Sequence, residues 1–423
     1  HKAALFEVLR ASISLVANLA TAGDWQSPSF EHSVHSMAGR YTGRITEHHD
    51  DYKRDRHADA EAFERAYLRE YARPPAAVRA RALMTTCGMA AFTTILAMIE
   101  RDLPGQGPVL VGASTYHECK DLILTGALGA RVLLVDEGDT SGLLAAVGHH
   151  RPPAIFLDSL CNAKGILVPD IHALVHHLRA QGPNTLLVID NTGLSAAFRP
   201  LSLQRADDDP IRIVAHESLT KYPQWGLDKV TGGMILAPVR EGAALADLRE
   251  HLGTNVCDAS VRVVPLPHRR LFERRLLRLS RNARLLAGHV QISAGEMGGG
   301  VVTGAVHPGL PGHPSSAVAG RRPFTGGFLA IEFAAGFDTI ETHRSFLHSL
   351  FERARHLHVP LTAGASFGLN TTRAYLTAVT SDHGAPFVRV SPGTEHRLGI
   401  EDLKRVLSCA LTETARRSER AGS

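Results

Sequence analysis

The sequence predicts an α/β fold in which a mostly parallel sheet is buried between helices, followed by a smaller α+β domain. Between residues 108 and 237, six short runs of β-branched and aliphatic residues alternate with segments of helix length, such as PDIHALVHHLRAQ. Strands buried on both faces of a parallel sheet have this composition. The runs are PVLVG at 108–112, RVLLVD at 131–136, AIFLD at 154–158, TLLVID at 185–190, RIVA at 212–215 and GGMILA at 232–237.

The chain on either side of these runs has a different pattern. Its first sixty or so residues are polar and rich in His and Asp after an initial helical pattern, ALFEVLRASISLVANLA, and we expect an arm. After about residue 250, amphipathic helices accompany two strand patterns, FLAIEF and FVRVSP. We therefore predict an N-terminal arm at 1–64, a large ligand-binding domain at 65–255 and a small C-terminal domain at 256–423.

Composition and charge exclude several classes of protein. The chain has 423 residues with 46 basic and 42 acidic side chains, and it lacks the long Lys/Arg tract of a nucleic-acid-binding arm. Its densest basic stretch, at 267–286, has leucines at helical spacing and indicates a helix with a solvated basic face. No apolar run reaches the roughly 18 residues that a membrane helix needs. We expect neither nucleic acid nor a membrane as a partner.

The cysteines and histidines argue against disulfides and metals. The five cysteines lie far apart without a Cys-x-x-Cys pair, which favours a reducing compartment. Histidine pairs such as His149-His150 are adjacent, whereas two ligands on one helix face need i,i+4 spacing. We therefore predict a soluble cytoplasmic protein without a metal site. Because His1 is not an initiator residue, we expect further residues to precede it in the natural chain.

The segment HESLTKYPQWGLDKVTGG at 216–233 is the most informative stretch. Ser218, Thr220 and Lys221 lie just past a predicted strand, where ligands of parallel sheets bind. A lysine that lies beside two hydroxyls and a Gly-rich loop is well placed to form a Schiff base next to a phosphate. Burial would lower the pKa of its amine. Taken alone, a solvated loop lysine is the simpler interpretation.

Three other segments favour the chemical interpretation. Asp190 ends a strand, where a carboxylate can keep a pyridine nitrogen protonated. Gly88 and Met89 open a predicted helix, whose N-terminal N–H groups bind phosphate. Tyr116 follows another strand, and its ring can stack on a flat cofactor while its phenol moves a proton.

Together these segments resemble the pyridoxal-phosphate enzymes of cysteine and methionine metabolism, the trans-sulfuration group that includes methionine γ-lyase and cystathionine γ-synthase. The resemblance covers about residues 52–408. The family's lysine motif, S-x-T-K-Y with an Asp seven residues after the Lys, fits residues 218–228. Its D-N-T motif fits 190–192, and its S-x-N motif fits Ser159 to Asn162 loosely. Further matches are Gly88, Met89, Tyr116, NARLLA at 282–287, HPGLPGHP at 307–314, SFG at 366–368 and VRVSPGTEH at 388–396.

The resemblance implies a fold-type I enzyme with pyridoxal 5'-phosphate as its cofactor, and it gives three residues catalytic roles. Lys221 would carry the cofactor as a Schiff base and then move protons. Asp190 would pair with the pyridine nitrogen, and Tyr116 would stack on the ring and act in acid/base steps. The further cofactor-binding residues that it implies are Gly88, Met89, Ser218 and Thr220 at the phosphate and Asn162 near the phenolic oxygen.

Substrate and subunit contacts are implied in the same way. Arg389 would bind the α-carboxylate of an L-amino acid as a bidentate fork, helped by Ser366. Tyr52 and Arg54 match the family's Y-x-R motif, which reaches the phosphate of a neighbouring subunit's cofactor. We therefore expect a homodimer with shared active sites, commonly inside a homotetramer.

Departures from the family pattern fall on the arm and the substrate-facing loops. The family's N-P-T after Y-x-R is replaced by residues 57–59, His-Ala-Asp, which leaves Tyr41 and Arg44 as a second candidate pair for the subunit contact. The family's G-H between Lys and Asp becomes Trp225-Gly226. Glu118 stands two residues after the stacking tyrosine, where we expect it to face the substrate side chain and favour a cationic or hydroxylated one.

These observations predict γ-elimination or γ-replacement on an L-amino acid. A halogenated unsaturated amino acid that yields an alkyne is one candidate substrate in specialised metabolism. A β-lyase or an aminotransferase would use the same cofactor residues, and a non-catalytic basic binding protein on the same scaffold is an alternative of another class. The sequence does not determine the substrate, whether the reaction is elimination or replacement, or whether the protein is a dimer or a tetramer.

Overall fold

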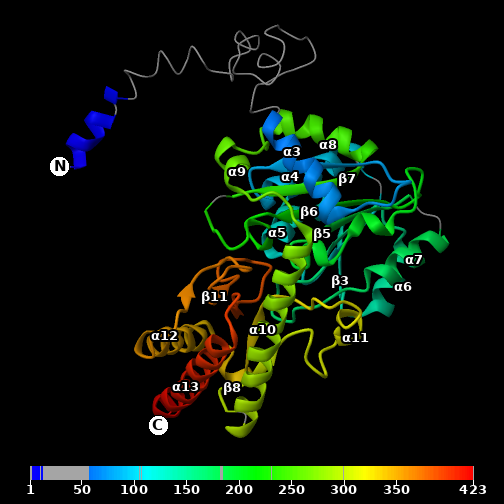
Figure 1. The fold of residues 1–423 in the computed structure, drawn as a ribbon. Coiled ribbons are helices and arrows are strands. Elements are labelled where there is room, and N and C mark those ends of the chain that lie inside the picture. Colours follow the sequence, from blue (N-terminus) through cyan, green and yellow to red (C-terminus); the bar gives the residue numbers. More distant parts are fainter. Residues whose placement is uncertain are drawn as a thin grey trace.

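The structure is a computed structural model that describes residues 2–9, 11–12, 57–103, 105, 107–181, 184–229, 231–298 and 300–422. Residues 2–9 are helical, as the initial pattern predicts. From residue 57 onward, the described chain forms two β-sheets with helices packed around each of them (Figure 1).

The first sheet has seven strands in the order β1-β7-β6-β5-β4-β2-β3. Strands β6, β5, β4, β2 and β3 pair in parallel, whereas β7 is antiparallel to both of its neighbours. The predicted α/β class with a mostly parallel sheet is therefore confirmed, and each predicted run contains a strand. The strands are β1 Ala80–Thr85, β2 Val109–Gly112, β3 Val132–Val135, β4 Ala154–Asp158, β5 Leu186–Asp190, β6 Arg212–Ser218 and β7 Gly233–Pro238.

Helices cover both faces of this sheet. Side chains alternate along a strand, so Leu187 and Ile189 of β5 lie in one core and Leu186 and Val188 lie in the other. Helices α3, α6 and α7 contribute to the first core, and α4, α5 and α8 to the second. Their bounds are α3 Ala58–Tyr67, α4 Gly88–Asp102, α5 His117–Thr125, α6 Thr140–His150, α7 Ile171–Gln181 and α8 Val239–Leu252, with short helical turns η2 Leu68–Ala72, η3 Gly129–Arg131, η4 Ser195–Ala197, η5 Pro200–Leu203 and η6 Tyr222–Gln224.

The second sheet has five strands in the order β10-β11-β12-β9-β8 and belongs to the predicted α+β part of the chain. All its pairs are antiparallel except β10 with β11. Helices α12 and α13 pack against each other, and α10 packs against β8 and α13. The elements are α9 Asp258–Val263, α10 Arg269–Glu296, β8 Val302–Val306, α11 Ser316–Ala319, β9 Leu329–Phe333, η7 Ala335–Phe337, α12 Ile340–His356, β10 Thr362–Ala363, β11 Arg373–Thr377, β12 Phe387–Ser391 and α13 Arg397–Gly422.

Helix α10 joins the two parts and runs from the first sheet to the second (Figure 1). Its Phe272 and Leu279 lie in a core of the first sheet, and Leu286 and Val290 lie in the core of the second. The amphipathic helix predicted for the basic stretch is thus confirmed. Helix α3 crosses the predicted limit at residue 64, with Phe63 buried beneath the large sheet. The domain limits themselves stay predictions.

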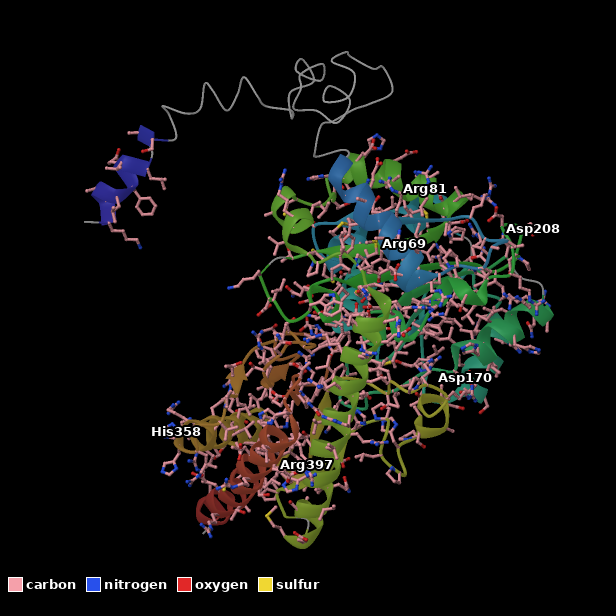
Figure 2. The ribbon with its side chains drawn as sticks, viewed as in Figure 1. Arg69, Arg81, Asp170, Asp208, His358 and Arg397 are labelled. Atoms are coloured by element: carbon pink, nitrogen blue, oxygen red, sulfur yellow. The ribbon has the colours of Figure 1, made fainter. Side chains whose placement is uncertain are left out.

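Exposed charges are spread over the molecule. Arg69, Arg81 and Asp208 are exposed on the part that carries the first sheet, and His358 and Arg397 are exposed on the part that carries the second (Figure 2). All five cysteines are free. Among the described residues, no helix combines the length and the apolar character that crossing a membrane requires.

Candidate active site

A cavity of about 410 Å³ lies at the carboxyl ends of the parallel strands, where the site was expected. One wall consists of segments that follow β1, β2, β4, β5 and β6, and the other comes from the part of the chain that carries the second sheet. Tyr52 and Arg54, like the alternative pair Tyr41 and Arg44, lie outside the described residues. The predicted site residues that line the cavity are Gly88, Met89, Tyr116, Glu118, Asn162, Asp190, Ser218, Thr220, Lys221 and Arg389.

Lys221 follows β6 and lines the cavity with its amine. Its Nζ lies 3.3 Å from Ser366 Oγ and 5.4 Å from the centroid of the Phe367 ring. Burial, and after it the positive charge of Arg389, lowers the pKa of Lys221 from 10.5 to about 8. Such an amine is nucleophilic near neutral pH. Ser366 also donates a 3.0 Å hydrogen bond to the carbonyl oxygen of Thr220, so it ties the lysine segment to the second part of the chain.

Gly88 begins helix α4 at the floor of the cavity. A Cβ atom at this position would lie 2.8 Å from Ser218 Cβ, so glycine permits the close approach of helix and strand. Ser218 Oγ and Thr220 Oγ1 are 2.6 Å apart beside it. The first N–H groups of an α-helix have no partner within the helix and favour an anion. Gly88, Met89, Ser218 and Thr220 thus form a cradle with the donors that a phosphate group needs.

Asp190, at the end of β5, and Tyr116, after β2, both line the cavity. The backbone N–H of Thr192 donates to Asp190 Oδ1 over 2.8 Å. The backbone N–H of Tyr116 donates to Asp158 Oδ2 over 3.1 Å, and its hydroxyl donates to Glu118 Oε2 over 2.8 Å. Burial, followed by the charge of Glu118, raises the pKa of the Tyr116 phenol. The phenol therefore keeps its proton at neutral pH and can act as a donor.

Arg389 of β12 brings a buried cation to the opposite wall. Its guanidinium donates to Asn162 Oδ1 over 2.6 Å and to the carbonyl oxygen of Ala365. The rings of Phe328 and Phe367 lie 5.6 and 5.2 Å from the guanidinium carbon. Burial lowers the pKa of Arg389 to about 10. Its Nε is buried without a partner among the described residues, so the fork has capacity left for a carboxylate.

Asn162 lies in the cavity wall, and its oxygen is bound to Arg389. Its predicted place near the phenolic oxygen of the cofactor stays a prediction. The assigned roles of the other site residues also remain predictions. Ser366 contacts Lys221 but is not among the residues that line the cavity.

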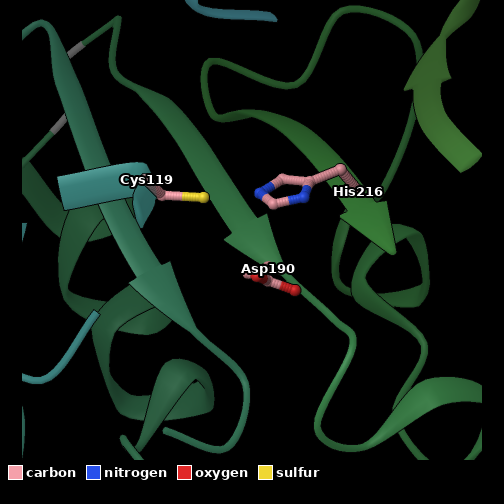
Figure 3. Close-up of side chains that lie close together, drawn as sticks. All are labelled: Cys119, Asp190 and His216. Carbon is pink, nitrogen blue, oxygen red and sulfur yellow. The ribbon is translucent and has the colours of Figure 1, made fainter. Parts of the chain in front are cut away.

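Sequence reasoning missed a group of side chains beneath the site. The Sγ of Cys119, a carboxylate oxygen of Asp190 and a ring nitrogen of His216 all lie within 4.8 Å of one another, and Figure 3 shows the three side chains converging. Among the described residues this is the group whose donors could hold a metal ion, and the predicted absence of a metal site stays a prediction. The sequence contained one signal for this group. His216 lies two residues before Ser218 on the same strand, and residues two apart on a strand point to the same face of the sheet.

Comparison with known families and curated proteins agrees with the geometry. Residues 25–411 match the family described as Cys/Met metabolism PLP-dependent enzyme. The bifunctional enzyme flvA of Aspergillus flavus is 25% identical over 340 residues, covering 78% of this chain and 38% of flvA. Cystathionine gamma-synthase 1, chloroplastic, of Arabidopsis thaliana is 26% identical over 274 residues, covering 63% of this chain and 44% of that protein. The chain thus spans less than half the length of these relatives.

Two solved structures share the fold. Cystathionine gamma synthase from Xanthomonas oryzae pv. oryzae superposes with a TM-score of 0.69 at 21% identity, covering 87% of this chain and 89% of that one. CalE6, a methionine gamma lyase from Micromonospora echinospora, gives a TM-score of 0.66 at 24% identity, covering 85% and 88%. These likenesses establish the predicted fold-type I architecture.

The electrostatics of Lys221 predict its titration in the protein freed of bound cofactor. Competitive labelling with an amine reagent should give a midpoint near pH 8 for Lys221, because burial disfavours its charged form. Arg389→Gln removes a neighbouring positive charge and should raise that midpoint. Arg405→Gln changes an exposed arginine and should leave it in place. A midpoint near 10.5 in the unchanged protein would contradict the site geometry.

Proposed function

Because the chain belongs to the Cys/Met metabolism PLP-dependent enzymes, we propose that it catalyses γ-elimination or γ-replacement on an L-amino acid. The observation that carries this proposal is the convergence of Lys221, Tyr116 and Arg389 in one cavity. The amine there has a pKa of about 8, the phenol keeps its proton, and the guanidinium is buried with a donor to spare. A base, an acid and a carboxylate fork are the three protein groups that this reaction class needs.

The described residues fit pyridoxal phosphate, the cofactor of the family. The cradle at Gly88, which a Cβ atom would fill, suits the phosphate, and Asp190 supplies a carboxylate for the ring nitrogen. Tyr116 provides a ring to stack against, and Lys221 provides the amine that attaches the cofactor. When bound, the cofactor supplies an electron-accepting ring that stabilises negative charge at the α-carbon of the substrate.

In the proposed reaction, different residues act on the α-carboxylate, on the protons at Cα and Cβ, and on the leaving group of the substrate. Arg389 binds the α-carboxylate and orients the amino acid in the cavity. Lys221 Nζ, once released from the cofactor, would take the proton from Cα, pass it on to the bound cofactor and, neutral again, take a second proton from Cβ. Tyr116, whose hydroxyl donates to Glu118 Oε2 in the free site, would turn that proton from Glu118 to the leaving group on Cγ. Water or a nucleophile then completes elimination or replacement.

Glu118 supports a proposal on the substrate side chain. It is exposed to the cavity, and its Oε2 already holds the Tyr116 hydroxyl, so its charge lies beside the position of the leaving group. A carboxylate there attracts a cationic side chain and accepts a hydrogen bond from a hydroxylated one. We therefore place Glu118 among the substrate-binding residues, with Arg389 and Ser366 at the carboxylate end.

The charge of the cavity supports a site shared between subunits. Among the described lining residues, the full cations are Lys221 and Arg389, and both have other roles. The phosphate cradle itself is neutral, so Arg54 of a neighbouring subunit, with Tyr52, would supply the missing charge in a homodimer or homotetramer. We further propose a cytoplasmic location, since five free cysteines suit a reducing compartment.

A substrate panel tests the reaction class. The purified enzyme is incubated with O-acetylhomoserine, cystathionine, methionine and halogenated allylglycines, with and without a thiol, while ammonia, halide and 2-oxo acid are measured. We expect release from a Cγ-substituted substrate, and a thioether when replacement dominates. Turnover confined to β-substituted alanines would establish a β-lyase, and amino transfer to a 2-oxo acid an aminotransferase. If no substrate is turned over and the protein carries no bound chromophore, the result would favour a non-catalytic binding protein.

Glu118→Gln tests the assignment of the substrate side chain. The amide keeps an acceptor for Tyr116 and removes the charge, so KM for a substrate with a cationic side chain should rise about tenfold, the size of one charge-assisted hydrogen bond. KM for an apolar substrate should stay within about twofold. Glu401→Gln, which changes an acid paired on the surface with Lys404, is the control. Equal effects on both substrates would remove Glu118 from the specificity role.

A further inference from the structure

A row of titratable side chains crosses the carboxyl ends of three adjacent strands beneath the cavity. Asp158 of β4 is the register partner of Asp190 of β5, and Asp190 is the register partner of His216 of β6. Register partners on parallel strands point to the same face, so the three side chains lie side by side. In Figure 3 the Cys119 sulfur points toward the His216 ring and the Asp190 side chain lies below both; their donor atoms all lie within 4.8 Å of one another.

His216 is buried as a neutral donor. It is 4% exposed, and its ring packs against Phe92 of α4 with centroids 5.4 Å apart. Burial lowers the pKa of His216, while the Asp190 charge acts in the opposite direction. At neutral pH the imidazole is therefore uncharged, and a neutral imidazole carries one N–H donor.

Two other buried groups lie beside Asp190, whose Oδ1 accepts the Thr192 N–H. Burial, and after it the charges of Asp190 and Glu137, raises the pKa of Asp158. Its Oδ2 accepts the Tyr116 N–H and its Oδ1 is buried without a partner among the described residues, so a protonated Asp158 would be a competing donor. Burial also raises the pKa of the Cys119 thiol, which contacts Met89 Sδ and is a weak donor.

We infer that His216 is a positioning residue that donates its ring N–H to Asp190 and keeps that carboxylate aimed at the ring nitrogen of the cofactor. A residue one layer behind a ligand commonly fixes the ligand's orientation in this way. The inference rests on the proposed pairing of Asp190 with the ring nitrogen.

Cofactor affinity tests this role without using turnover. The full-length protein is freed of cofactor and titrated with pyridoxal phosphate or with its carbon analogue, in which C–H replaces the ring nitrogen. His216→Leu should weaken binding of pyridoxal phosphate by about tenfold to a hundredfold, as expected for one hydrogen bond to a charged group, and should change the analogue by less than about threefold. His216→Gln retains an N–H donor and should recover most of the affinity. Cys119→Ser should stay within about threefold for both ligands.

The analogue separates the possible outcomes. Equal losses for both ligands would show that His216 only holds the fold, and unchanged affinity for both would show that Asp190 does not need it; either result overturns the inference. If the unchanged protein binds both ligands equally well, the pairing of Asp190 with the ring nitrogen fails, and the inference fails with it. His216→Met, which keeps volume without a donor, serves as the second variant if His216→Leu does not fold.

Discussion

Two cations, Arg389 fully buried and Lys221 partly buried, share one cavity, and much of the structure serves to hold them there. Lys221 comes from the end of β6 and Arg389 from the middle of β12, so each half of the described chain contributes one. The burial of Lys221, and after it the positive charge of Arg389, lowers the pKa of Lys221. Burying unpaired charge is unfavourable unless a ligand compensates it. In the proposed function, an anionic cofactor and an amino-acid carboxylate would supply that compensation.

The architecture fixes the two cations relative to each other through α10. Phe272 at one end packs against Tyr71 with ring centroids 4.6 Å apart, in the core under the large sheet. Asn282, in the middle, donates to the carbonyl oxygens of Gly393 and Glu395, just after β12. The helix thus connects the strand that carries Arg389 to the core that supports Lys221. The Phe367 ring lies under both cationic groups and completes the junction.

The structural features that could be predicted are those that a short stretch of sequence determines. Short apolar runs predict buried strands, so six strands and the ends that carry Asp190 and Lys221 could be located. The runs did not show that β3 is partly exposed at the sheet edge or that β7 is antiparallel. Strand β1 was missed because alanine and arginine open it and give no strand signal. The row that joins Asp158, Asp190 and His216 depends on register between strands, and the Arg389 contact to Asn162 depends on how two parts of the chain pack. Neither can be derived from spacing along one strand.

The central claim is that Lys221 is the amine that holds the cofactor, and reductive trapping tests it most directly. Borohydride reduction of the purified protein, followed by peptide mapping, should place a pyridoxyl group on Lys221 Nζ. Lys221→Ala should abolish the adduct, whereas Lys229→Ala should retain it. A pyridoxyl group on another lysine, or no adduct on a protein that carries the chromophore, would contradict the account.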